Sequence, residues 1–133
     1  DRESIGAEKA GIFRTGVPAV IGDPAPPASV LAHAQACGAV AIRAGIDFRV
    51  VAGDGSLRYV GADGHALSLP TLPLPGPSQP ANAATAIAAL RALSGRLPVD
   101  DAAMVAGLAG VRLAARLQRL GEDPELRVDV AHN

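Results

Sequence analysis

Val17-Pro18-Ala19-Val20-Ile21 is a short apolar run that predicts a buried strand, with a proline near the first position, where strands tolerate one. A second run, Ala39-Val40-Ala41-Ile42, predicts another strand. Between the two, apolar residues recur at helical spacing from Ala28 onwards, and Gly38 ends the predicted helix. This strand–helix–strand order predicts an α/β fold with a parallel pair of strands.

The segments on either side of this unit are also short. Upstream, residues 3–13 form a candidate helix, with Asp1 or Ser4 as its cap. Downstream of Asp47 we expect a three-stranded antiparallel meander, because turn signals separate three strand-like runs; it would form a small flap or an extension of the sheet. The runs are Phe48–Ala52, Leu57–Val60 and Ala66–Leu69, and the turn signals are Asp54-Gly55 and Asp63-Gly64.

Residues 70–80 are rich in proline and precede two predicted helices. One interpretation of this stretch is a polyproline ligand; the alternative, which we favour, is a stiff connection that orients the next helix. The first helix is predicted from about Gln79 to Leu93, and Asp100 or Asp101 caps the second. The predicted apolar faces comprise Ala83, Ala86, Ile87, Leu90 and Leu93 in the first helix and Met104, Val105 and Leu108 in the second.

The last part of the chain changes character. Residues 111–121 are basic and less regular, residues 122–125 form a polar break, and residues 126–131 predict a new strand that stops at His132-Asn133. This strand would have no partner element after it, and the chain opens abruptly at Asp1. We therefore expect a central slice of a longer protein, without its N- and C-terminal parts.

The composition argues against several classes of function. Of the 133 residues, 49% are hydrophobic but only 2% aromatic, which suits one domain with an aliphatic core. A net charge of −1 argues against a nucleic-acid partner, because such proteins need a basic face. One cysteine cannot form an internal disulfide, and no apolar run approaches the roughly 20 residues that span a bilayer. With no signal peptide at Asp1, we expect a cytoplasmic protein that binds no membrane.

The basic residues are arginines with one exception, Lys9. A lysine can lose its proton and react as an amine, whereas an arginine stays charged at any biological pH. Lys9 is therefore a candidate functional residue; the alternative is a surface lysine retained by chance.

Three further side chains are candidates for a ligand site. Asp129 and His132 lie at the C-terminal end of a predicted strand, where open α/β sheets bind ligands; the alternative is a solvated chain end. Asn82 lies at a helix start, where it could bind the polar edge of a ligand or, more in keeping with its residue type, cap the helix. Together these residues suggest a nucleotide site. His33 and His65 are far from His132 in sequence, so a histidine metal site is disfavoured.

Three blocks of sequence occur in a recognisable order and spacing. They are Asp1-Arg2-Glu3-Ser4-Ile5-Gly6-Ala7-Glu8-Lys9-Ala10-Gly11-Ile12-Phe13-Arg14; Leu72-Pro73-Leu74-Pro75-Gly76 with Gln79-Pro80-Ala81-Asn82-Ala83-Ala84-Thr85-Ala86; and Asp129-Val130-Ala131-His132-Asn133. Together they resemble the bacterial folylpolyglutamate synthase/dihydrofolate synthase family across nearly the whole chain. The first block is the most specific, and the third is shared more widely among Mur-type ligases.

The resemblance implies a fold, an activity and cofactors. Residues 1–110 would belong to a Mur-ligase-type central ATP-binding domain, residues 111–124 to an interdomain linker, and residues 125–133 to the first strand of a Rossmann-like C-terminal domain. Family members use ATP and Mg²⁺ to join L-glutamate to dihydropteroate, or to the γ-carboxylate of folates, through an acyl phosphate. The phosphate-gripping glycine loop and the glutamate site would lie outside this slice, which alone should be inactive.

The resemblance also implies site residues. Lys9 matches a lysine that family members carry as a carbamate, a catalytic group that also holds a magnesium ion near the γ-phosphate. The remaining matches are Gln79 and Asn82 near adenine, Arg116 on the ATP phosphates, Asp129 at the ribose, and His132, a catalytic and binding residue beside the nucleotide.

One motif departs from the family pattern: Leu113-Ala114-Ala115-Arg116 stands where the linker usually reads Leu-Pro-Gly-Arg, so the resemblance does not fix the turn before Arg116. Two rival functions stay open. Another Mur-type ligase, acting on a peptidoglycan precursor, shares Asn82 and the last block but fits the first block less well. A non-catalytic interaction domain requires the proline-rich stretch to be exposed and detached from the helix at Asn82.

Overall fold

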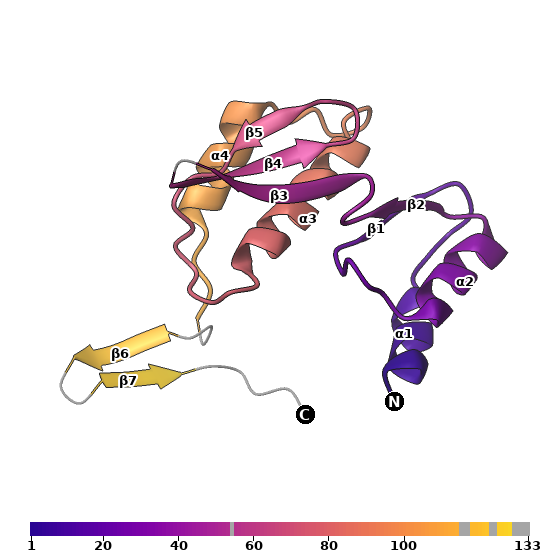
Figure 1. The fold of residues 1–133 in the computed structure, drawn as a ribbon, viewed down its shortest axis with the longest axis horizontal. Coiled ribbons are helices and arrows are strands. Elements are labelled where there is room, and N and C mark those ends of the chain that lie inside the picture. The colour runs from indigo at the N-terminus through magenta and orange to yellow at the C-terminus, as the bar shows by residue number, and fades with distance from the viewer. Residues whose placement is uncertain (54, 115–117, 123–124, 129–133) are drawn as a thin grey trace.

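The computed structural model describes residues 1–53, 55–114, 118–122 and 125–128 of the chain. Its helices are α1 (Arg2–Ala10), α2 (Ala28–Cys37), α3 (Gln79–Ala92) and α4 (Asp101–Gly110). Its strands are β1 (Pro18–Ile21), β2 (Val40–Arg43), β3 (Phe48–Gly53), β4 (Ser56–Gly61), β5 (Ala66–Ser68), β6 (Gln118–Glu122) and β7 (Glu125–Val128). Figure 1 shows β1 and β2 beside α1 and α2, and β3, β4 and β5 against α3 and α4.

The strand–helix–strand unit forms as predicted. β1 and β2 are parallel, in a register that pairs Pro18 with Val40 and Ile21 with Arg43. The helix between them, α2, ends at Gly38, whose positive φ of 70° is the left-handed conformation that favours glycine at a helix end. The predicted parallel pair and the α/β class are therefore confirmed.

α1 ends earlier than predicted. Asp1 caps it, because the Asp1 carboxylate accepts a hydrogen bond of 2.8 Å from the Ser4 backbone N–H. The helix stops at Ala10 and not at Phe13, since Gly11 closes its last turn and Phe13 bonds back to the Ala10 carbonyl in a separate turn. The prediction that it continues to Phe13 was wrong, because glycine is a poor helix former.

The antiparallel meander forms as expected, in the order β3-β4-β5. It is a separate three-stranded sheet, so the prediction that it could extend the sheet of β1 and β2 was wrong. Its aromatic residues Phe48 and Tyr59 are buried in one core cluster with residues of α3 and α4, and this packing makes it a layer of its own. Their rings stack at 6.1 Å between centroids. The buried members of this cluster are Phe48, Tyr59, Leu67, Leu69, Ala83, Ala84, Ile87, Ala88 and Met104.

The two helices of this core occupy nearly the predicted ranges. Asp100 caps α4, accepting a 2.7 Å bond from the Ala103 N–H. The buried face of α3 is rotated from the predicted one: Ala84 and Ala88 are buried, whereas the predicted face residues Ala86 and Leu93 are exposed. Because the helix is apolar on most sides, the spacing of its apolar residues does not determine which face is buried. Its packing against β3, β4 and β1 determines the buried face.

The segment predicted as an irregular linker contains a strand. β6 pairs antiparallel with β7, and the register shifts between Arg119 and Gly121. β7 begins at Glu125, one residue before the predicted start, and its predicted continuation to residue 131 lies outside the described residues. Among the described helices, none combines the length and the apolar character needed to cross a membrane.

Candidate functional site

An apolar slot of about 200 Å³ opens where α3 begins. Two of the predicted ligand residues, Gln79 and Asn82, lie on its wall in the first turns of α3. The other lining residues are Leu72 and Leu74 of the proline-rich stretch, Ala83 and Ala86 of α3, Gly107 and Leu108 of α4, and Val111. The structure thus brings Gln79 and Asn82 together, as their shared motif predicts.

The proline-rich stretch forms one wall of the slot. Leu72 packs against the main core, and Leu72 and Leu74 line the slot together with Asn82. Pro80 lies at the start of α3, where the missing N–H of a proline costs nothing. Pro73, Pro75 and Pro77 are exposed, as an interaction domain requires, but Leu72 and Leu74 are half-buried. The stretch is therefore attached to the core through Leu72, which argues against the detachment that the interaction domain also requires.

The amide of Asn82 is not used as a helix cap. Ser78 is the N-cap of α3 and makes no side-chain capping bond, while the Asn82 N–H donates to the Ser78 carbonyl at 2.9 Å as an ordinary helical residue. The capping interpretation of Asn82 was therefore wrong. Its side-chain amide donates only a long 3.5 Å bond to Gln79, and Gln79 donates a 3.4 Å bond to the Pro75 carbonyl.

These two amides decide what the slot can bind. Each amide group offers both donors and an acceptor, and bonds of 3.4 to 3.5 Å are weak enough to be exchanged for a ligand. Apolar walls with a few polar groups at the rim are typical of small-molecule sites. A flat heteroaromatic ring with donors and acceptors along one edge fits this combination. A second hollow, of about 420 Å³, lies beside the slot and shares Leu72, Leu74 and Gln79 with it.

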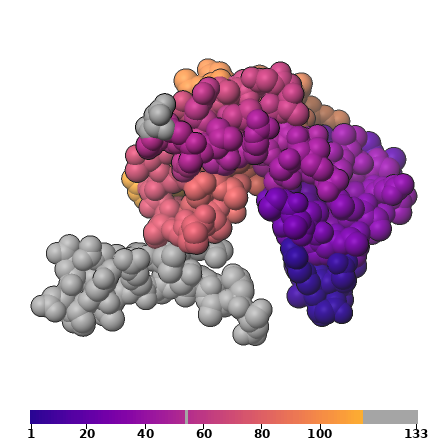
Figure 2. Space-filling view, in the orientation of Figure 1, coloured from indigo at the N-terminus to yellow at the C-terminus, as the bar shows by residue number. Residues whose placement is uncertain are grey.

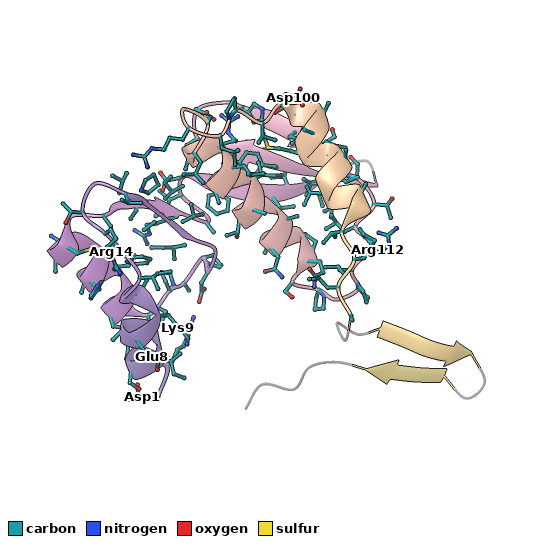
Figure 3. All side chains as sticks on the ribbon, turned by 180° about the vertical axis from the view of Figure 1, so that it is seen from behind. Asp1, Glu8, Lys9, Arg14, Asp100 and Arg112 are labelled. Carbon is teal, nitrogen blue, oxygen red and sulfur yellow. The ribbon has the colours of Figure 1, made fainter. Side chains whose placement is uncertain are left out.

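Lys9 lies elsewhere, in the last turn of α1. Its side chain is 74% exposed, and Nζ donates a 2.8 Å hydrogen bond to Glu8 Oε1. This bond and the charge of Glu8 raise the pKa of Lys9 and lower that of Glu8. In Figure 3 the Lys9 side chain leaves α1 on the flank nearer α3. In Figure 2 a hollow separates the indigo N-terminal residues from the salmon start of α3.

The residues around Lys9 fix the position of α1. The Glu3 carboxylate accepts bonds from the N–H groups of Ala28 (3.1 Å) and Ser29 (2.9 Å), so it caps α2, whose own N-cap is Pro27. These bonds lower the pKa of Glu3. Gly6 allows α1 close to α2, because an added Cβ would lie 2.8 Å from the side chains of Pro27 and Ser29.

Sequence reasoning missed this role of Glu3. A signal was present, because α2 begins Pro27-Ala28-Ser29 and its N-cap position lacks the serine, threonine, aspartate or asparagine side chain that usually caps a helix. An unsatisfied helix start predicts an acceptor from another element. For Gly107, Leu108 and Val111 no such signal exists, because only tertiary packing brings α4 to the slot.

The described residues do not form a complete metal site. Nowhere in this part of the chain do three or more His, Cys, Asp or Glu side chains gather as a metal would require, and Glu8 is the acidic residue that bonds Lys9. His33 lies near the ring of Phe13, and His65 Nε2 is 3.0 Å from Asp101, which supports structural roles for both. Arg116, Asp129 and His132 lie outside the described residues.

Known proteins resemble this chain from end to end, although no family model matches it. The dihydrofolate synthase/folylpolyglutamate synthase of Escherichia coli K12 is 46% identical over all 133 residues, which are 30% of that protein's length. A structure of E. coli FolC in complex with DHPP and ADP matches with a TM-score of 0.84 and 42% identity, covering 100% of this chain and 31% of that one. The bifunctional enzyme from Yersinia pestis, complexed with AMPPNP and Mn, matches with a TM-score of 0.80 and 40% identity, at 100% and 31% coverage.

The fold agrees with these structures over the whole chain, while the chain spans about a third of the length of each relative. The match runs through all three sequence blocks on which the family resemblance rests, including the first block around Lys9 and the motif of Gln79 and Asn82. These 133 residues are therefore homologous, from end to end, to a segment of the bacterial dihydrofolate synthase/folylpolyglutamate synthase family.

Proposed function

We propose that the protein carrying this chain is an ATP-dependent ligase that adds L-glutamate to dihydropteroate, to the γ-carboxylate of folates, or to both. The observation that carries the proposal is the apolar slot with the Gln79 and Asn82 amides at its rim, in a chain 46% identical throughout to an enzyme of that name. In the related E. coli structure the bound molecules are DHPP and ADP.

In this proposal the slot receives the adenine ring of ATP. Leu72, Leu74 and Leu108 exclude water from the faces of the ring, and the amides of Asn82 and Gln79 bind its polar edge. The reaction begins when a substrate carboxylate oxygen attacks the γ-phosphorus and ADP leaves, which gives an acyl phosphate. The glutamate amine then attacks the acyl carbon, loses a proton and displaces inorganic phosphate, forming the amide.

The remaining predicted residues complete the proposed site. Lys9, as a carbamate, would give Mg²⁺ one anionic oxygen ligand near the γ-phosphate, where the metal offsets phosphate charge. Arg116 would contact the ATP phosphates, Asp129 the ribose, and His132 the nucleotide. Residues 1–110 would be part of a Mur-ligase-type central ATPase domain, residues 111–124 a linker, and residues 125–133 the start of a Rossmann-like domain.

The experiment is an assay of the full-length protein with ATP, Mg²⁺, L-glutamate and dihydropteroate, and in parallel with a reduced folate. Formation of dihydrofolate or a folate diglutamate, with one ADP per amide bond, is expected. A UDP-linked sugar acid with amino acids serves as the substrate of the rival peptidoglycan ligase. Turnover of that substrate alone, or no ADP formation with any substrate, would refute the proposal.

Asn82→Ala tests the nucleotide slot within that assay. Loss of one net hydrogen bond of about 1 kcal/mol predicts a KM for ATP several-fold to about tenfold higher. kcat should change little, because the adenine edge is bound equally in the ground and transition states. Ala81→Ser, on the neighbouring exposed position outside the slot, is the matched control. An unchanged KM in Asn82→Ala would remove Asn82 from the site.

A further inference from the structure

The parts of the proposed site lie on two lobes: Lys9 on the lobe of α1, α2, β1 and β2, and Gln79 with Asn82 on the lobe of α3, α4 and the meander. Val20 and Ile42 of the first lobe pack against the core of the second, and at Gly22 the first lobe lies against α3. Gly22 follows β1 directly, at the carboxyl end of a parallel strand, and lies against Thr85 of α3. Thr85 is three residues after Asn82, so the two side chains are neighbours on the helix surface. The end of β1 therefore touches α3 one turn from the proposed adenine slot.

No side chain fits at residue 22. A Cβ built on Gly22 would overlap Thr85 Oγ1 and would lie 3.1 Å from Thr85 Cγ2 and 3.2 Å from Thr85 Cβ. Thr85 cannot turn away freely, because its hydroxyl donates a 2.8 Å bond to the Ala81 carbonyl and a β-branched side chain always fills two of its three rotamer positions. A larger residue 22 would therefore push α3 and β1 apart.

The same loop is fixed to the helix that carries Lys9. Asp23, the next residue, forms an ion pair with Arg2 of α1, and the Arg2 guanidinium also donates to the Ala25 carbonyl at 2.8 Å. Asp23 in turn accepts the Ala25 N–H at 2.9 Å, which closes the turn. The loop after β1 is thus bonded to α1 on one side and pressed against α3 on the other.

We infer that Gly22 is a positioning residue that sets the spacing between the adenine slot and Lys9. The inference rests on the proposed function, since it concerns a nucleotide whose base lies at Asn82 and whose phosphates extend toward α1. Such a ligand spans both lobes, so its affinity depends on their separation. The affinity of a ligand that fills only the slot does not depend on that separation.

The experiment measures two dissociation constants by calorimetry on the full-length protein with Mg²⁺: one for adenosine and one for AMPPNP. In Gly22→Ala we expect AMPPNP to bind about tenfold more weakly or worse, which is the cost of losing one hydrogen bond to a charged phosphate group. Adenosine should bind as it does to the unaltered protein. A purely structural loss would weaken both ligands together.

A second test asks whether a substitution at Thr85 restores the AMPPNP affinity that Gly22→Ala loses. Thr85→Ala removes the atoms that a Cβ at residue 22 would meet, so the double variant Gly22→Ala with Thr85→Ala should recover most of the AMPPNP affinity. Thr85→Ala alone should bind both ligands normally. If Gly22→Ala does not fold, Thr85→Ile adds bulk to the same contact from α3 and should reproduce the selective loss, with Thr85→Val as the control of equal size.

Each result decides a different question. Equal weakening of adenosine and AMPPNP, no weakening of either, or no rescue by Thr85→Ala overturns the positioning role of Gly22. Failure of the unaltered protein to bind adenosine and AMPPNP overturns the proposed nucleotide site itself, whatever the variants do.

Discussion

At the scale of single residues, Lys9 forms an exposed ion pair with the residue before it, Glu8. The 2.8 Å hydrogen bond from Nζ to Glu8, and the charge of that carboxylate, raise the pKa of the amine. A carbamate forms only on the neutral amine, so the Glu8 pairing opposes that reaction. The carbamate that we propose would be negatively charged, so it could not keep this hydrogen bond to the Glu8 carboxylate.

Lys9→Arg separates charge from amine chemistry. A guanidinium retains the positive charge and can still bond Glu8, but it cannot form the carbamate that we propose. We expect kcat of the full-length ligase to fall by about a hundredfold or more, the usual cost of losing a group that stabilises transition-state charge. The melting temperature should stay the same, because Lys9 is 74% exposed. Undiminished turnover would exclude Lys9 from catalysis.

At the scale of elements, α1 and α2 act as one unit because a side chain of the first completes the second. Glu3 accepts the two N–H groups at the start of α2, and the Ser29 hydroxyl donates back to the Glu3 carbonyl at 2.7 Å. Glu3 therefore fixes α1, with Lys9 on its last turn, to the start of α2.

The pH dependence of the stability of Glu3→Gln tests whether Glu3 holds α1 and α2 together. The pKa of Glu3 is lowered by its backbone bonds, so its stabilising effect is complete above the ordinary value of 4.5 and disappears as the pH falls through the lower folded value. At pH 7 the variant should unfold at a lower urea concentration than the unaltered protein, and the difference should shrink below pH 4.5. Glu8→Gln, which bonds only within α1, should have a smaller effect at pH 7. A difference independent of pH would contradict the capping role.

Ile87→Ala tests which face of α3 forms the core. Ile87 is 1% exposed, so truncation should lower the free energy of unfolding by about 2–5 kcal/mol. Leu93, which the sequence also assigns to the apolar face, is 41% exposed, and Leu93→Ala should cost less than about 1 kcal/mol. Urea denaturation of both variants measures the contrast, and similar losses would contradict the observed packing.

At the scale of the whole molecule, the hollow between α1 and the start of α3 is the feature with functional consequence (Figure 2). The loop after β1 joins its two sides, through Arg2 and Asp23 on one side and Gly22 and Thr85 on the other. A bound nucleotide that spans the hollow should therefore reduce local opening in both lobes.

Amide hydrogen exchange of the full-length protein tests this coupling. With saturating AMPPNP and Mg²⁺ we expect slower exchange in α1 and the loop 22–27 as well as in α3, because bound ligand reduces local opening on each side. Adenosine should slow exchange around the slot alone, in residues 72–83 and α4. Protection of α3 alone by AMPPNP would mean that the phosphates do not reach α1.

The local features follow from the residues themselves. The parallel pair, the meander and the C-terminal end of α2 before Gly38 are set by apolar runs, turn residues and a glycine cap, which act over a few residues. The pairing of Gln79 with Asn82 also follows from their spacing of three residues on one helix. The Lys9 assignment came from its being a lone lysine and from the family block, and its chemistry stays a prediction.

Tertiary structure alone decided the rest, because it depends on contacts between residues far apart in the chain. The mostly apolar α3 could bury several faces, and packing selected the one with Ala84 and Ala88. The slot exists only because α4 and the proline-rich stretch meet at Asn82, and no local pattern predicts that meeting. The requirement for glycine at position 22 arises only from the tertiary contact with Thr85, which leaves no room for a Cβ.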